Sequence, residues 1–190
     1  IWVGFDATTK YSITNFHHEM GIAVESNGFQ YQSVSVGDAP CDCCRSDSFV
    51  TAKGDWVLAY RAATDLGRQG QIAVSPADSA SFTWSSAVHT DWWVDAPCPQ
   101  QGPQLAELRD GTLLYASSDN QTGTQDAYVA LSADGGHTWT GKISLAPSLP
   151  NPRNPGLTVD EDGRVWAWLR KSAMESVLVT SDDGGHTWSS

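Results

Sequence analysis

The four cysteines of this 190-residue chain lie in two short stretches that repeat one another, and thiols of this kind can carry redox or metal chemistry. "DAPCDCC" occupies residues 38–44, and "DAPC" returns at residues 95–98. We expect a disulfide between the two stretches, because it would cross-link neighbouring segments and restrict the unfolded chain. Such a bridge implies an oxidising compartment. The cysteines concerned are Cys41, Cys43, Cys44 and Cys98.

A thiolate metal site and free thiols are the alternatives for the same four cysteines. Zn and Cu(I) both accept sulfur ligands, and His17 or His18 could complete the coordination. The C-x-C-C spacing, however, lacks the two-residue gap that lets a turn direct two sulfur atoms at one ion. The sequence therefore favours a disulfide without a cofactor over a Zn or Cu centre.

The overall charge restricts the partners of the chain. There are 11 Lys plus Arg against 22 Asp plus Glu, which gives a formal net charge of −11. This charge repels phosphate backbones and anionic lipid surfaces, so we expect neither nucleic acid nor a membrane as partner. No apolar run approaches the roughly 20 residues that span a bilayer, and the first residues do not resemble a signal peptide. If the protein is exported, we expect its leader to lie outside this chain.

The elements that position these residues are short strands separated by turns. Stretches such as "WVLAY", "TLLYAS" and "RVWAWL" are rich in β-branched and aromatic residues and are bounded by Gly, Asp and Ser. "SADGGHTW" at 132–139 returns almost unchanged as "SDDGGHTW" at 181–188, and "SPADSASFTW" at 75–84 is a looser copy. Repetition at about 50 residues is typical of propellers and solenoids. We therefore expect an all-β fold of repeated units.

A glycine turn precedes each copy and sets a common register. The turn glycines are Gly54, Gly111 and Gly163, and the seventh residue after each is Arg61, Ser118 and Arg170 in turn. The thirteenth residue before each glycine is Cys41, Cys98 and Pro150, so the two "DAPC" stretches are equivalent. The approximate repeats are 1–37, 38–94, 95–149 and 150–190, and both ends fall within a unit. We expect missing chain segments or self-association to complete the fold.

The spacing S-x-D-x-G-x-x-W resembles the Asp-box, or bacterial neuraminidase repeat, of the sialidase superfamily. Two sets of residues match it: Ser132, Asp134, Gly136 and Trp139, and then Ser181, Asp183, Gly185 and Trp188. The resemblance implies a β-propeller of four-stranded antiparallel blades, with about four blades in this chain as part of a six-bladed ring. In that family the motif forms an outer turn away from the ligand, so we expect His137 and His186 to be turn residues.

The resemblance also implies a site at one end of the strands. Sialidases bind the substrate carboxylate with three arginines, and use an Asp as acid/base and a Tyr nucleophile supported by a Glu. The candidates for binding substrate are Arg45, Arg61, Arg153, Arg170, Trp92 and Asp95. The candidates for catalysis are Asp38, with Asp6 or Asp95 as alternatives, and the pair Tyr11 and Glu19. No "RIP" stretch is present. In a purely structural interpretation, Arg61 and Arg170 neutralise neighbouring loop carboxylates.

Three functions of different classes remain open from the sequence. The first is a secreted or periplasmic sialidase-like propeller that recognises an acidic glycan or another small anionic ligand, and hydrolyses it if the Tyr and Glu pair is present. The second is a non-catalytic propeller that binds carbohydrate or protein. The third is a metal-binding or redox protein that uses "CDCC".

Overall fold

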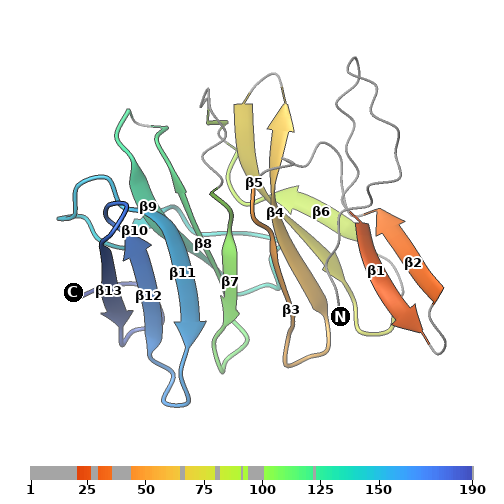
Figure 1. Ribbon diagram of the computed structural model, residues 1–190. Coiled ribbons are helices and arrows are strands. Elements are labelled where there is room, and N and C mark those ends of the chain that lie inside the picture. The colour runs from red at the N-terminus through yellow and green to blue at the C-terminus, as the bar shows by residue number, and fades with distance from the viewer. Residues whose placement is uncertain are drawn as a thin grey trace.

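The fold consists of antiparallel β-sheets (Figure 1). The computed structural model describes residues 21–26, 30–35, 44–64, 67–79, 82–90, 92–93, 101–121 and 123–189. One four-stranded sheet contains β3 (Asp47–Val50), β4 (Trp56–Thr64), β5 (Gly67–Ser75) and β6 (Trp84–Ala87). A second contains β7 (Gln104–Glu107), β8 (Leu113–Asp119), β9 (Asp126–Ser132) and β10 (Ile143–Ser144). In both sheets, consecutive strands are neighbours.

Two smaller sheets complete the described part of the chain. A three-stranded sheet contains β11 (Arg153–Val159), β12 (Val165–Arg170) and β13 (Ser176–Ser181). An isolated bridge between Thr180 and Ser189 extends it beyond β13. A separate hairpin pairs β1 (Gly21–Ser26) with β2 (Gln30–Ser35). The prediction of an all-β chain is confirmed for the described residues, which contain no helix and hence no helix able to cross a membrane.

Tight turns between the first and second strands of each sheet set the predicted register. The turn glycines have φ of 91° at Gly54, 86° at Gly111 and 85° at Gly163. Positive φ of this kind is readily adopted only by glycine, which explains why each turn contains one. The equivalent positions seven residues later therefore lie at matching places near the ends of β4, β8 and β12.

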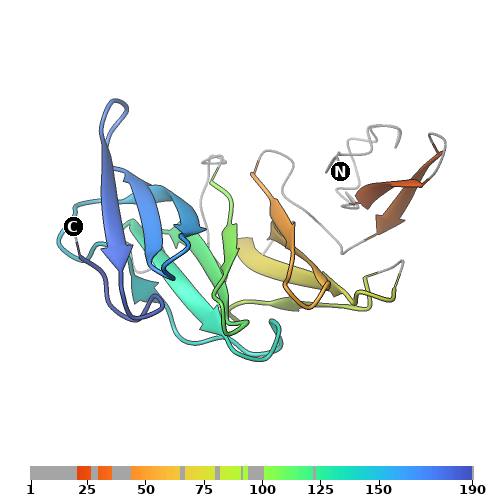
Figure 2. The ribbon, with the colours of Figure 1, turned by 90° about the horizontal axis from the view of Figure 1, so that it is seen from below.

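The three larger sheets lie beside one another (Figure 2). Apolar side chains on alternating positions pack between them. Leu113 and Tyr115 of β8 belong to the core shared with the β3–β6 sheet. Leu114 and Ala116 of the same strand belong to the core shared with the β11–β13 sheet. The period of two residues thus buries both faces of the middle sheet, which explains why β8 is an almost continuous apolar run.

The first strands of successive sheets lie next to one another. A side-chain oxygen of Asp47 in β3 accepts a hydrogen bond from the backbone nitrogen of Leu105 in β7 at 2.8 Å. Glu107 in β7 accepts one from the backbone nitrogen of Ala52 at 2.8 Å. β7 in turn contacts β11. The first strands therefore form a row, and the second and third strands of each sheet lie farther from it. Side chains fill the space between neighbouring sheets.

Candidate functional site

The candidate site lies where the second strands of two sheets end. Because strands alternate in direction, the end of each second strand lies beside the start of the first strand in the same sheet. Arg153 at the start of β11 is accordingly paired with Arg170 at the end of β12. Arg61 in β4 and Ser118 in β8 occupy the corresponding end of their sheets. These repeat positions therefore lie at the same end of the strands in each of the three larger sheets.

Arg61 crosses the gap between the β3–β6 and β7–β10 sheets. Its Nη2 donates to the carbonyl oxygen of Ser118 at 3.0 Å and to Oγ of Ser117 at 3.3 Å, and its Nη1 lies 3.9 Å from Sγ of Cys44. The guanidinium carbon lies 4.4 Å from the centre of the Trp93 ring, which is a cation–π contact. Only 3% of Arg61 is exposed. The residue therefore joins two sheets from a buried position.

Ser118 links three segments at this point. Its hydroxyl donates to Oε1 of Gln101 at 2.7 Å and accepts from the backbone nitrogen of Asn154 at 3.2 Å, while its carbonyl accepts from Arg61. Asn154 and nearby Asn151 have φ of 51° and 52°, a left-handed conformation that asparagine tolerates better than most residues. This network fixes the start of β11, and hence the position of Arg153.

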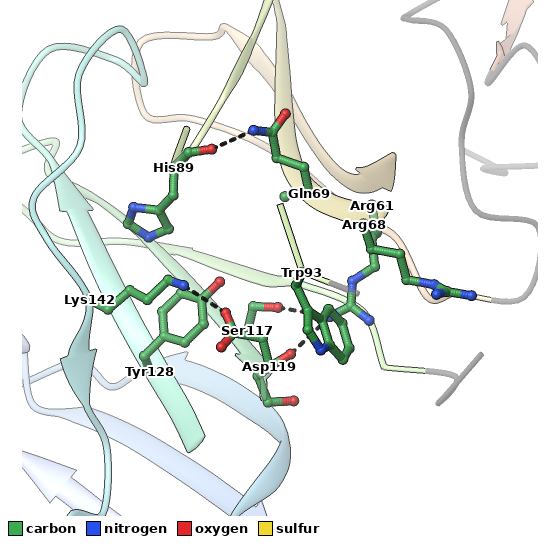
Figure 3. Close-up of a pocket in the computed structure, with 11 residues that line it drawn as sticks. Arg61, Arg68, Gln69, His89, Trp93, Ser117, Asp119, Tyr128 and Lys142 are labelled. Carbon is green, nitrogen blue, oxygen red and sulfur yellow. Dashed lines mark hydrogen bonds and ion pairs between the residues drawn. The ribbon is translucent and has the colours of Figure 1, made fainter. Parts of the chain in front are cut away.

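A narrow pocket opens beside Arg61 between the two sheets (Figure 3). It encloses about 310 Å³ of empty space, including solvent at its mouth. On the β7–β10 side, Lys142 Nζ donates to Asp119 and to Gln121, each at 2.8 Å, and lies 5.0 Å from the centre of the Tyr128 ring. The rest of the lining comes from Arg68, Gln69, Gly70, His89, Trp93, Ser117 and Ser118.

Two buried tyrosines lie at this pocket: Tyr128 lines it, and the phenol of Tyr115 lies against Gly70, another lining residue. Burial raises the pKa of Tyr115 to about 12, and the charge of Arg61 opposes part of that rise. Burial likewise raises the pKa of Tyr128 well above its ordinary value. Both phenols therefore stay protonated at neutral pH and can act as hydrogen-bond donors. Neither is prepared as a nucleophile, because an anionic oxygen would be strongly disfavoured there.

Arg153 and Arg170 form an exposed cationic pair at this end of the strands. They are direct cross-strand partners, both side chains are exposed, and Arg170 Nε donates to the carbonyl of Ser172 at 3.1 Å. Like charges placed opposite one another destabilise a sheet. The pair is therefore a feature that folding alone does not favour.

Several predicted site residues lie outside the described residues. These are Asp6, Tyr11, His17, His18, Glu19, Asp38, Cys41, Cys43, Asp95 and Cys98. Of the others, Arg45 is exposed, with its carbonyl against Gly102 just before β7, and Trp92 is half-buried. Cys44 is buried beside Arg61 and is the one cysteine within the described residues, so both the disulfide and the thiolate metal site stay predictions. Within that same part of the chain, no group of three His, Cys, Asp or Glu side chains could hold a metal ion.

The sequence did not predict the roles of Ser117, Asp119, Tyr128 and Lys142, which line the pocket. Ser117 and Asp119 lie in β8, Tyr128 lies in β9 and Lys142 precedes β10, so none of the four lies in the loops that we expected to form the site. The available signal was the register that aligns Ser118 with Arg61 and Arg170, because it marked β8 as a contributor to the same end of the strands.

The two S-x-D-x-G-x-x-W segments form nearly identical turns after β9 and β13. Ser132 Oγ donates to Asp134 at 2.8 Å and accepts from Gly136 N at 2.8 Å, and the indole of Trp139 donates to the carbonyl of Gly136 at 2.9 Å. The equivalent bonds of Ser181, Asp183, Gly185 and Trp188 measure 2.7, 2.8 and 3.0 Å. These polar groups are used within their own turns, as expected for a structural motif.

The repeats, the turns and the stacked sheets agree with the comparison to known families. The profile of the BNR repeat-like domain matches residues 45–190, which is most of the chain. The chain belongs to this family. No curated protein matches the sequence.

Solved structures of similar fold include carbohydrate-active proteins. A protein of unknown function from Dyadobacter fermentans has a TM-score of 0.57 at 18% identity, over 76% of this chain and 52% of its own. The Hadza microbial sialidase Hz136 has a TM-score of 0.54 at 18% identity, over 75% of this chain and 32% of its own. An ulvan lyase of polysaccharide lyase family 25, bound to a sugar, has a TM-score of 0.58 at 13% identity, over 82% of this chain and 38% of its own. The BNR repeat-like chain thus spans about half or less of these proteins, and the likeness concerns the fold.

Proposed function

We propose that this BNR repeat-like chain is a sialidase-like module that recognises an acidic glycan, such as a sialoside, at the end of the strands that carries Arg153 and Arg170. The observation that carries this proposal is the direct, exposed pairing of these two arginines. A carboxylate between them would relieve their repulsion and accept paired hydrogen bonds from planar guanidinium groups. The formal charge of −11 makes such a cationic pair stand out from the rest of the chain.

A propeller is the arrangement that we propose for the sheets. The open face of the β11–β13 sheet bears Trp168, which is 45% exposed, and Leu178, which is 53% exposed. The residues in the same register of the β7–β10 sheet are Ala116 and Val129, and both are 0% exposed because the next sheet covers them. The open face therefore has the position and composition of a surface that stacks on a further sheet. Further chain segments or a second copy would supply that sheet.

The proposed module would be an enzyme if it also hydrolyses the glycan that it binds. Hydrolysis of a sialoside requires an accessible nucleophile and an acid, for which Tyr11 with Glu19 and Asp38 are our candidates. The tyrosines whose side chains are described, Tyr60, Tyr115 and Tyr128, are all buried, which favours the second candidate function, a binding module without hydrolysis. In either case, a secreted or periplasmic location is proposed together with the disulfide of Cys98.

Calorimetric titration with 3′-sialyllactose, with lactose as the uncharged control, tests the proposed function. We expect the sialylated sugar alone to bind, and Arg153→Gln and Arg170→Gln each to weaken binding roughly tenfold or more, as expected for the loss of a charged hydrogen bond. Arg109→Gln, which removes an exposed arginine from a turn, is the matched control. Equal binding of lactose, or equal loss in all three variants, would contradict the proposal. Release of a fluorophore from a fluorogenic sialoside distinguishes an enzyme from a binding module.

A further inference from the structure

Arg61 is a buried cation whose partners are neutral. Its hydrogen bonds run to a thiol sulfur, a hydroxyl and a carbonyl, and the indole of Trp93 covers one face. Among the described residues, no carboxylate forms an ion pair with it. A guanidinium group has five N–H donors, and three acceptors do not saturate them. A charge removed from water in this way is costly unless an opposite charge accompanies it.

The space next to Arg61 is the pocket between the β3–β6 and β7–β10 sheets. Lys142 on the opposite wall brings another cation, which forms an ion pair with Asp119 (Figure 3). The phenol of Tyr128 lies beside Lys142 and is kept protonated by burial, so it can donate to an anion. The pocket thus combines three cationic side chains, those of Arg61, Arg68 and Lys142, and a neutral donor with one acidic side chain, Asp119, among the described lining residues.

We propose that this pocket binds one small oxyanion, of the size of a sulfate or a carboxylate group, with Arg61 as its principal counter-charge and Lys142 as a second ligand. The pocket is lined by residues of β4, β5, β8 and β9 and of segments that follow β6 and precede β10. None of its lining residues belongs to the first strands β3, β7 and β11. Neither Arg153 nor Arg170 lines it, so the inference concerns a site other than that pair and goes beyond glycan recognition.

The anion could be free in solution or carried by a larger molecule, since both present the same oxygens to Arg61. The space open to the centre of a water molecule is only about 20 Å³, which favours a single small anionic group over a whole sugar ring, since pockets for larger ligands usually hold about 300 Å³ or more. A bound anion would neutralise the charge of Arg61 and stabilise the contact between the two sheets that Arg61 joins.

Titration calorimetry with sodium sulfate, in a chloride buffer of constant ionic strength, tests the site. Heats are measured in preference to melting temperatures, because sulfate stabilises most proteins by exclusion from their surfaces. We expect one sulfate per chain, no saturable heat for Arg61→Gln, and binding weakened roughly tenfold or more for Lys142→Gln, as expected for a lost charged hydrogen bond. Lys171→Gln is the matched control, since Lys171 also pairs with a carboxylate, that of Glu175 at 3.2 Å, on a distant exposed turn.

Each outcome bears on the proposal. Binding that is lost with Arg61 or Lys142 but kept in Lys171→Gln supports the site, and Lys142→Gln decides the matter if Arg61→Gln does not fold. Parallel titrations with glucuronate and methyl sulfate show whether the pocket also admits an anion carried on a larger group. No saturable heat with sulfate, or equal weakening in Lys142→Gln and Lys171→Gln, would overturn it. Arg153→Gln should leave sulfate binding within about twofold, so that this proposal and glycan recognition fail separately.

Discussion

Arg61 of β4 donates a hydrogen bond at 3.0 Å to the carbonyl oxygen of Ser118 in β8, and so connects the second strands of two neighbouring sheets. The two residues hold the same place in consecutive repeats. One repeat supplies a long cationic side chain at this place, that of Arg61. The next supplies a small residue, Ser118, whose carbonyl and hydroxyl form hydrogen bonds with Arg61, Gln101 and Asn154. Ser118 is thereby the point at which three sheets are fixed relative to one another.

Removing the hydroxyl of Ser118 should destabilise the fold more than removing that of Ser117. Ser118→Ala leaves Gln101 Oε1 and the amide of Asn154 without their common partner in a buried place, at an expected cost of about 1–3 kcal/mol. Ser117→Ala loses a 3.3 Å contact with Arg61, which keeps its bond to the Ser118 carbonyl, so we expect about 1 kcal/mol or less. Urea unfolding of both variants measures the difference. An equal loss of unfolding free energy in the two variants would mean that the hydroxyl of Ser118 contributes no more to stability than that of Ser117.

Gly70 is required because the phenol of Tyr115 occupies the space above it. A Cβ atom on Gly70 would lie 2.1 Å from Tyr115 Oη, so we expect Gly70→Ala to cost about 1–3 kcal/mol through overpacking. No described residue forms a hydrogen bond with that buried Oη, so Tyr115→Phe should be close to neutral, and it should restore part of the loss when combined with Gly70→Ala. The control is Gly141→Ala, where nothing lies within 4 Å of the added atom. A double variant no more stable than Gly70→Ala would contradict this account.

The strands and their turns could be predicted because local physics decides them. Gly54, Gly111 and Gly163 mark turns that need positive φ, and the alternation of β8 follows from burial on both faces. The pocket could not be predicted, because Lys142 and Asp119 meet through the pairing of strands and not through proximity in the sequence. The burial of Arg61 depends on how closely two sheets stack, which no single repeat specifies. Prediction placed Arg61 at the correct end of its strand without revealing that it faces the neighbouring sheet.

The carboxylates of the two S-x-D-x-G-x-x-W turns should make the protein sensitive to strong acid. Hydrogen bonds from the side chain and amide of Thr138 lower the pKa of Asp134 to about 2, and those of Thr187 lower the pKa of Asp183. A lowered pKa stabilises the folded state above the ordinary value near 4, and that contribution is lost as the pH falls toward 2. Thermal melts between pH 5 and pH 2 should show the loss, and it should be smaller in Asp134→Asn than in the control Asp162→Asn. Carbon NMR of the Asp134 carboxyl should give a higher pKa in Thr138→Val, and an unchanged pKa would refute the assigned cause.

Relief of the repulsion between Arg153 and Arg170 should stabilise the protein while it weakens glycan binding. Arg170→Gln removes one of two like charges that face each other across β11 and β12, so we expect a gain in the free energy of unfolding of a few tenths of a kcal/mol, about the size of a cross-strand pair. The gain should be largest at low ionic strength and should fade as salt screens the pair. Arg109→Gln, in the turn before β8, should show no such gain. If sialyllactose is added, the order should reverse, because only the chain with both arginines gains binding energy. A variant that is less stable than the parent chain at low salt and without ligand would show that the two arginines are held together by something other than an anionic ligand.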